Sequence, residues 1–234
     1  MAPTSCISNA IAARSMRALR PLSTPSIPQG RRVAMSRVHP DPRALAAAKY
    51  VVAFEVKPAA GETETYFDIA GKLRPALLAM DGFLANDRFR SRARPGAFLS
   101  LSFWESEAAL VRWRNESMHR GAQSIGRAHL FEDYRLRVGR LVEPGAASVP
   151  GDGRAFVILD GTARDLPRFE QMADADVFDH LTEAGRVATV LECANAGAAW
   201  GLWTLLRPRQ EFTCHLILTL RDYGLNRRQE APIC

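Results

Sequence analysis

One order of expected strands and helices occurs twice along this chain of 234 residues, and this repeat limits the folds that the chain can adopt. The first copy runs from about residue 50 to residue 143, and the second begins near residue 154. Between them, residues 144–153 are rich in Gly, Pro and Ala and have the composition of a linker. The repeat predicts two similar structural units of about 100 residues rather than one large domain.

In the first copy, the spacing of apolar residues separates strands from helices. Ile69, Leu73 and Leu77 recur at intervals of four residues and mark one face of a helix. Ser106 followed by Glu107 is typical of the start of a second helix. The expected order is a strand at 50–56, a helix at 62–80, strands at 83–90 and 97–104, a helix at 106–127 and a strand at 134–142. This β-α-β-β-α-β order is the ferredoxin-like, split βαβ arrangement, an α+β fold in which both helices cover one face of an antiparallel sheet.

The second copy repeats this order with one difference. Segment 197–205 aligns with segment 96–104 without a gap, which predicts a second hairpin of strands. Only residues 207–211 then separate that hairpin from the closing strand, too few for a helix. We therefore expect that the second unit lacks its second helix. Its expected elements are a strand at 155–159, a helix at 166–181, strands at 187–193 and 198–206, and a closing strand at 212–220.

A sheet with helices on one face exposes a large apolar surface on the other. Packing the two open faces together removes both from water, at roughly 25 cal/mol per Å² of apolar area. We therefore expect an intrachain pair of antiparallel sheets that resembles a barrel, with two independent domains on a tether as the alternative. The expected division is a disordered leader at 1–45, a first domain at 46–143, a linker at 144–153 and a degenerate second domain at 154–234.

The charge of the chain is concentrated in its first 40 residues. The net charge is +6, and residues 1–40 alone contain six Arg and no acid. The folded part then sums to zero and shows no basic cluster with interleaved aromatics, so we expect no nucleic-acid partner. The leader is either translated sequence upstream of a start at Met35, which predicts a cytoplasmic protein, or an organellar transit peptide.

The remaining composition points to a reduced, soluble protein. No apolar run approaches the roughly 18 residues of a membrane span, so we expect no membrane partner. Four cysteines show no metal-ligand spacing, which favours an intracellular protein without a metal site. A disulfide between Cys193 and Cys214 stays open if their strands are neighbours.

The first copy also resembles a known family. The segments that carry the resemblance are Asp-Gly-Phe at 81–83, Leu-Ser-Leu-Ser-Phe-Trp-Glu-Ser-Glu at 99–107, Ala-Leu-Val-Arg-Trp-Arg-Asn at 109–115, His-Arg-Gly-Ala-Gln-Ser-Ile-Gly-Arg at 119–127 and Phe-Glu-Asp-Tyr-Arg-Leu-Arg-Val at 131–138. Through these segments the first copy is similar to the antibiotic biosynthesis monooxygenases of the dimeric α+β barrel group. In that group two subunits normally build the barrel, and here the second copy could supply the other sheet, while a homodimer stays open. The end of the chain, from Arg221 to Pro232, resembles the ending of single-domain members.

The second helix of the first copy carries the candidate site. His119, Gln123 and Arg127 are spaced by four and lie along one side of it, with Trp104 and Trp113 nearby. We expect His119 to accept a proton, Arg127 to stabilise an oxyanion and Trp113 to complete the catalytic group. Trp104 and Gln123 are the expected substrate-binding residues. The alternative is a solvated helix face beside two core tryptophans, and the other histidines are expected to be structural or exposed.

The resemblance implies two kinds of chemistry. Haem-degrading members carry a His ten residues after a helix Trp, but Gln123 stands ten residues after Trp113, which makes haem the weaker alternative. Quinone-forming members use no cofactor, and the chain has neither GxGxxG nor GxxxxGK[ST]. The favoured hypothesis is a cofactor-independent monooxygenase that uses dioxygen on a small aromatic or polyketide-like substrate, with one site per chain. A non-catalytic ligand-binding or stress protein is the alternative from another class.

Overall fold

The computed structural model describes residues 45–167 and 175–232. The first unit has the expected β-α-β-β-α-β order, and its strands agree with the expected positions within about three residues. Leu77 of the first helix is buried, which confirms the apolar face read from the spacing. The elements of this unit are β1 (Tyr50–Pro58), α2 (Thr63–Leu78), β2 (Phe83–Ser91), β3 (Phe98–Trp104), α3 (Glu107–Asn115), α4 (Ser117–Ile125), η1 (Gly126–Leu130) and β4 (Phe131–Leu141).

The predicted helix at 106–127 is divided into α3, α4 and the π-helical turn η1. Ser106 caps α3 as expected, since its hydroxyl accepts a hydrogen bond from the backbone N–H of Ala109. Glu116 has the extended ψ of 134° and ends α3. Its carboxylate then accepts from the backbone N–H of His119 at 2.8 Å and caps α4. The prediction of one continuous helix is therefore wrong at Glu116.

The second unit contains the helix that the sequence alignment excluded. Segment 197–205, predicted as a strand, lies within α5, so the expectation that this unit lacks its second helix is wrong. Asn195 caps α5 by accepting from the N–H of Ala198 at 2.9 Å. Part of the predicted helix at 166–181 is β6, and residues 168–174 of it lie outside the described residues. The elements are β5 (Ala155–Thr162), β6 (Ala175–His180), β7 (Arg186–Glu192), α5 (Ala196–Leu206) and β8 (Phe212–Gly224).

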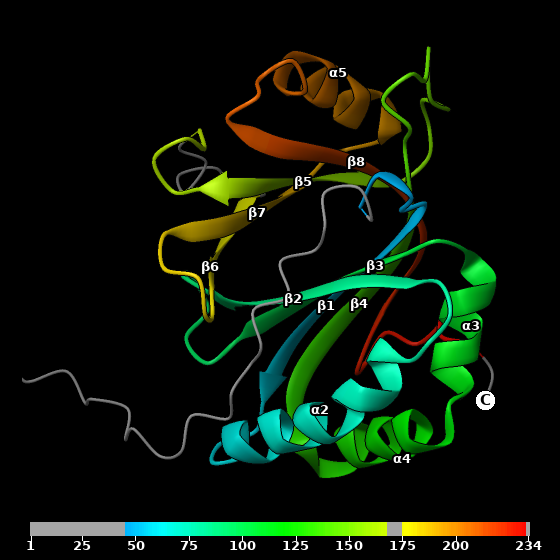
Figure 1. The fold of residues 1–234 in the computed structure, drawn as a ribbon, viewed down its shortest axis with the longest axis vertical. Coiled ribbons are helices and arrows are strands. Elements are labelled where there is room, and N and C mark those ends of the chain that lie inside the picture. The colour runs from blue at the N-terminus through cyan, green and yellow to red at the C-terminus, as the bar shows by residue number, and fades with distance from the viewer. Residues whose placement is uncertain (1–44, 168–174, 233–234) are drawn as a thin grey trace, which may run out of the picture. The chain divides into compact units, whose positions relative to one another are not determined.

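The strands of both units form one closed barrel in the order β1-β3-β2-β6-β7-β5-β8-β4. Two antiparallel seams join the units, β2 with β6 and β4 with β8. The expected intrachain barrel is therefore confirmed, and the alternative of two tethered independent domains is wrong (Figure 1). Both units fill the interior with apolar side chains, among them Val51, Phe89, Leu99, Leu101, Phe103, Phe156, Ile158, Phe178 and Ile217.

Charged side chains reinforce the joints between the units. At the β2–β6 seam Arg92 pairs with Asp179 at 2.8 Å, and across β4 and β8 Arg135 pairs with Asp222 at 2.7 Å. The Arg92–Asp179 pair is exposed and adds little stability, whereas the side chain of Asp222 is 9% exposed, so its pairing with Arg135 favours one register of the two sheets over others. Cys193 and Cys214, which the sequence left as a potential disulfide, are not bonded to each other.

The helices cover the outside of the barrel. Figure 1 shows α2, α3 and α4 beside the β1–β4 sheet, and α5 over β5 and β8. Beneath α5 the space is filled: Trp203 is 2% exposed, and its indole N–H donates to the carbonyl of Cys214 at 3.1 Å. Within the described ranges, no helix is long and apolar enough to cross a membrane.

Candidate functional site

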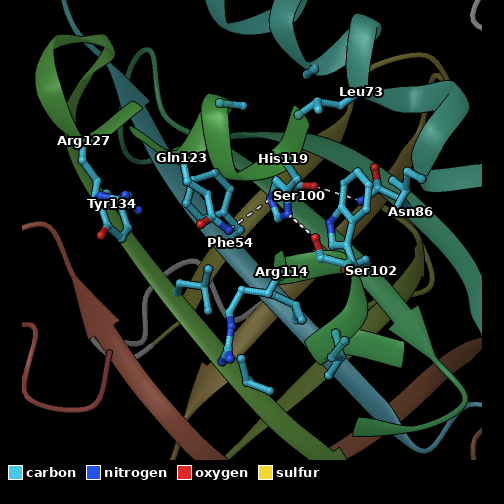
Figure 2. A pocket seen from close by; sticks show the side chains of 18 of the residues that line it. Phe54, Leu73, Asn86, Ser100, Ser102, Arg114, His119, Gln123, Arg127 and Tyr134 are labelled. Carbon is cyan, nitrogen blue, oxygen red and sulfur yellow. Dashed lines mark hydrogen bonds between the residues drawn. The ribbon is translucent and has the colours of Figure 1, made fainter. Parts of the chain in front are cut away.

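A cavity of about 260 Å³ lies between the outer face of the β1–β4 sheet and helices α2, α3 and α4 (Figure 2). Residues from the tail that follows β8 also line it. The lining brings together the predicted site residues Trp104, Trp113, His119, Gln123 and Arg127. Their placement around one cavity is a structural fact, whereas their roles stay predictions.

The sheet forms the floor of the cavity through side chains that alternate outward along each strand. In one row Ser100 of β3 lies between Arg88 of β2 and Phe54 of β1. In the next row Ser102 lies between Asn86 and Val52. The floor is therefore polar along β2 and β3 and apolar along β1. Further apolar lining comes from Leu73, Leu77, Leu136 and Val138.

His119 is held in one orientation at the centre of the lining. Its Nδ1 lies 2.8 Å from the carbonyl oxygen of Trp113, and its ring stacks on that indole with centroids 4.4 Å apart. A carbonyl can only accept, so Nδ1 carries the proton and Nε2 has a free lone pair in the neutral ring. Gln123 lies 3.5 Å from Nε2, the contact drawn in Figure 2.

Burial lowers the pKa of His119 below its ordinary value of 6.5, although the Trp113 carbonyl and the charge of Glu116 act in the opposite direction. The imidazole is therefore neutral at pH 7. A neutral imidazole with Nε2 unprotonated beside a cavity is able to act as a general base.

The two tryptophans differ in their surroundings. Trp104 is 1% exposed, packs edge-on against Phe83 and donates its indole N–H to the hydroxyl of Ser102 at 2.9 Å. It is a core residue that presents part of its surface to the cavity. Trp113 is half-buried and contributes the stacked face that supports His119.

The charged residues of the lining are all arginines. Arg127 lies towards one end of the cavity in Figure 2 and donates to the hydroxyl of Ser124 at 3.4 Å. Arg221 pairs with Glu107 at 3.0 Å, and Arg228 donates to the Tyr134 hydroxyl at 2.9 Å. Arg88 and Arg114 also line the cavity, and no described acidic residue does.

Several lining residues were not predicted from the sequence. Asn86, Arg88, Ser100 and Ser102 could have been found, because alternation along β2 and β3 places them on the face of Trp104. The only signal for the tail residues was the resemblance of residues 221–232 to the ending of single-domain members, and that resemblance was not used to place them in the site. Among residues 45–167 and 175–232, no three His, Cys, Asp or Glu side chains gather as a metal site.

Comparison with known proteins finds similarity in the first unit. Residues 49–124 match the family model for antibiotic biosynthesis monooxygenase. Over 141 residues the chain is 49% identical to the jasmonate monooxygenase ABM of Pyricularia oryzae, which covers 60% of this chain and 58% of that protein. The chain thus spans less than two thirds of that relative.

Two further similarities are more distant. The uncharacterized protein YqjZ of Bacillus subtilis is 27% identical over 92 residues, covering 39% of this chain and 78% of YqjZ. A crystal structure of an antibiotic biosynthesis monooxygenase overlaps with a TM-score of 0.35 at 18% identity, covering 43% of this chain and 99% of that one. Residues 49–124 are thus similar to the antibiotic biosynthesis monooxygenase family.

Proposed function

We propose that this chain is a monooxygenase that uses dioxygen on a small organic substrate bound in the cavity, without a metal or flavin. The observation that carries the proposal is the state of His119: neutral, with Nδ1 fixed on the Trp113 carbonyl and Nε2 beside the cavity. The similarity of residues 49–124 to the family model and the printed name of the relative from Pyricularia oryzae support the same reaction class.

The proposed reaction begins with proton transfer. Nε2 of His119 removes a proton from a carbon or phenol made acidic by a neighbouring carbonyl or aromatic system. The electron-rich substrate anion reduces dioxygen and forms a hydroperoxide, which loses water to give a ketone or quinone. In sum, a CH₂ group and O₂ become a C=O group and H₂O, so the substrate supplies all the electrons. Arg127 and the other cavity arginines stabilise the negative charge.

The cavity suits a substrate with a large apolar part. Phe98 and Phe131 are large rings near the cavity, and neither fills it. Phe98 packs against Phe67 with ring centroids 5.0 Å apart and does not line the cavity, whereas Phe131 forms one of its walls. Small aromatic or polyketide-like compounds are the first class to test. A jasmonate, the compound in the relative's name, is the second.

Oxygen uptake by the purified protein tests the proposal, with a panel of anthrones and jasmonic acid under air and under nitrogen. His119→Ala should lower the rate on the accepted substrate about 100-fold, the usual size of a general-base contribution. His129→Ala is the matched control, because His129 is exposed on η1. The proposal fails if no compound consumes oxygen or if His119→Ala turns over at the unaltered rate.

The two alternative functions give different results in the same experiments. A ligand-binding protein would bind panel compounds but consume no oxygen. A haem protein would show a Soret band on titration with hemin. This alternative is the weaker one, because Gln123 occupies the position at which haem-degrading family members carry their iron ligand.

A further inference from the structure

We propose that Arg88, Ser100 and Ser102 form a carboxylate-binding site at the β2–β3 edge of the cavity, and that the protein takes small amphipathic carboxylic acids. This inference deepens the proposed function, because it names the substrate class of the same cavity. Only the claim that the acid is a substrate rests on the proposed function. Binding of the acid can be measured without turnover.

Arg88 is the first observation. Its side chain lines the cavity, and its Nε is inaccessible to solvent with no hydrogen-bond partner among the described residues. Among those residues Nε of Arg137 also has no hydrogen-bond partner, but the guanidinium of Arg137 pairs with Glu55, and that of Arg186 lies 2.8 Å from Asp87. Arg88 as a whole is half-buried, but a buried N–H without an acceptor is costly, and a ligand carboxylate accepting from the planar N–H groups of Arg88 would remove that cost.

The two serines of β3 are the second observation. The Ser100 hydroxyl accepts from Nδ2 of Asn86 at 2.9 Å, and the Ser102 hydroxyl accepts from the indole N–H of Trp104 at 2.9 Å. A hydroxyl that already accepts still has its own O–H to donate. Within the described part of the chain, neither O–H has an acceptor among the hydrogen bonds formed.

The register brings these donors together. Arg88 pairs directly with Ser100 across β2 and β3, and Ser102 lies two residues along on the same face. Opposite residues on neighbouring strands have Cβ atoms about 5 Å apart. One guanidinium and two hydroxyls, all with protons to donate, therefore border one small region. A carboxylate, which only accepts, matches this set.

The charge of the whole lining agrees with an anionic ligand. Its charged members are five arginines, and no described Asp or Glu lines the cavity. The apolar floor beside the polar edge, formed by Val52 and Phe54, would hold the hydrocarbon part of the ligand. Anchoring the carboxylate at β2 and β3 would leave the rest of the molecule to extend across the cavity that His119 lines.

Equilibrium binding under nitrogen tests the inference, with 1-naphthylacetate as the acid and 1-naphthylacetamide as its uncharged counterpart. A hydrogen-bonded charge contributes on the order of a 10- to 100-fold change in affinity, so the wild-type protein should bind the acid at least about 10-fold more tightly than the amide. Arg88→Met should bring the acid to the affinity of the amide and leave the amide within about twofold. Ser100→Ala should weaken the acid about three- to tenfold.

Arg90→Met is the matched control. Arg90 is exposed on the same strand two residues later and does not line the cavity, so the same loss of charge there should leave both affinities unaltered. Should Arg88→Met fail to fold, two milder variants carry the test: Arg88→Lys keeps a cation, and Ser100→Ala removes a single hydroxyl.

Three results would overturn the inference: equal affinity for acid and amide, equal losses in Arg88→Met and Arg90→Met, or no saturable binding of the acid. Failure of the proposed function is a separate result. If the acid binds selectively but no compound consumes oxygen, the carboxylate site stands and the monooxygenase proposal falls. If oxygen is consumed equally well with uncharged substrates, the monooxygenase proposal stands and the carboxylate site falls.

Discussion

The imidazole of His119 lies nearly parallel to the indole of Trp113, with ring centroids 4.4 Å apart and planes inclined by 15°, while its Nδ1 bonds to the carbonyl of the same residue. In a continuous helix, residues six apart would point about 120° away from each other. The break at Glu116 turns α4 back, so that His119 meets the end of α3. The orientation of the proposed base therefore depends on the helix break.

Removing the indole should alter the titration of His119. The pKa of His119 is lowered chiefly by burial, so Trp113→Ala, which opens one face of the ring to water, should raise it towards 6.5. Trp113→Phe keeps an aromatic cover and should raise it less. Histidine resonances followed by NMR between pH 4 and pH 8 measure both values, with exposed His129 as the reference. An unaltered His119 titration in Trp113→Ala would show that the indole does not shield it.

The same pKa sets the pH dependence of the proposed activity. A base works when unprotonated, and the lowered pKa of His119 keeps it so at pH 7. Oxygen uptake should therefore be flat above about pH 6.5 and fall as the pH drops through the pKa of the folded protein. Trp113→Ala should move this fall to higher pH. Rates measured across that range check it, and a fall centred above pH 7 in the wild-type protein would contradict it.

Much of the first unit could be predicted from the sequence, because local signals and tertiary demands agree there. Ser106 is a cap by its chemistry, and Leu77 is buried where the spacing of four placed it. The sequence could place the five predicted site residues at one cavity because they lie at the end of β3 and on the consecutive elements α3, α4 and η1 that follow it. Their roles remain to be tested.

The second unit could not be read in the same way. Its alignment with segment 96–104 favoured a strand, but Ala196, Ala199, Trp203 and Leu206 are buried at helical intervals of three and four. Segments 96–104 and 197–205 have similar compositions, so the alignment did not distinguish the alternation of a strand from the intervals of three and four of a helix. The residues of β6, in contrast, had a helical spacing but form a strand, because they pair with β7 and β2. Tertiary pairing outweighed local preference there.

The buried pair between Glu55 and Arg137 should contribute far more stability than an exposed pair on the same two strands. Glu55 is 6% exposed and Arg137 is 2% exposed, so Glu55→Gln leaves an inaccessible guanidinium partly uncompensated. The expected loss is about 3 kcal/mol in the free energy of unfolding. Urea denaturation measures it. In the control, Glu132→Gln breaks the exposed pair with Lys57 and should cost less than about 1 kcal/mol; equal losses would contradict the prediction.

His215 should make the fold less stable in mild acid. Burial lowers its pKa to about 4, whereas the unfolded chain has the ordinary value near 6.5. Between these values the unfolded state binds a proton that the folded state does not, so stability falls as the pH drops from about 6.5 to about 4. The ring packs beside Phe103, at 5.4 Å between centroids, so His215→Leu keeps the site apolar.

The measurement is the free energy of unfolding at pH 7 and pH 5, above the range in which most carboxylates titrate. The wild-type protein should lose roughly 1.5 kcal/mol more between these pH values than His215→Leu, a figure reduced for the partial exposure of the residue. Parallel losses in the two proteins would show that His215 is not the group responsible.

Two glycines on the α4–η1 segment should respond to alanine in opposite directions. At Gly126 an added Cβ would lie 2.4 Å from Cε2 of Phe131, a ring that lines the cavity, so Gly126→Ala must displace that ring or distort the π-helical turn. The expected cost is about 1–3 kcal/mol. At Gly121 nothing lies within 4 Å, and Gly121→Ala should stabilise α4 by roughly 0.5–1 kcal/mol. Thermal unfolding of both variants measures the difference.

Because Phe131 would move, Gly126→Ala should also weaken binding of 1-naphthylacetate and 1-naphthylacetamide to the same extent. Arg88→Met, in contrast, should weaken binding of the acid alone. A stabilised Gly126→Ala variant would mean that the approach of Phe131 to Gly126 does not limit the shape of the cavity.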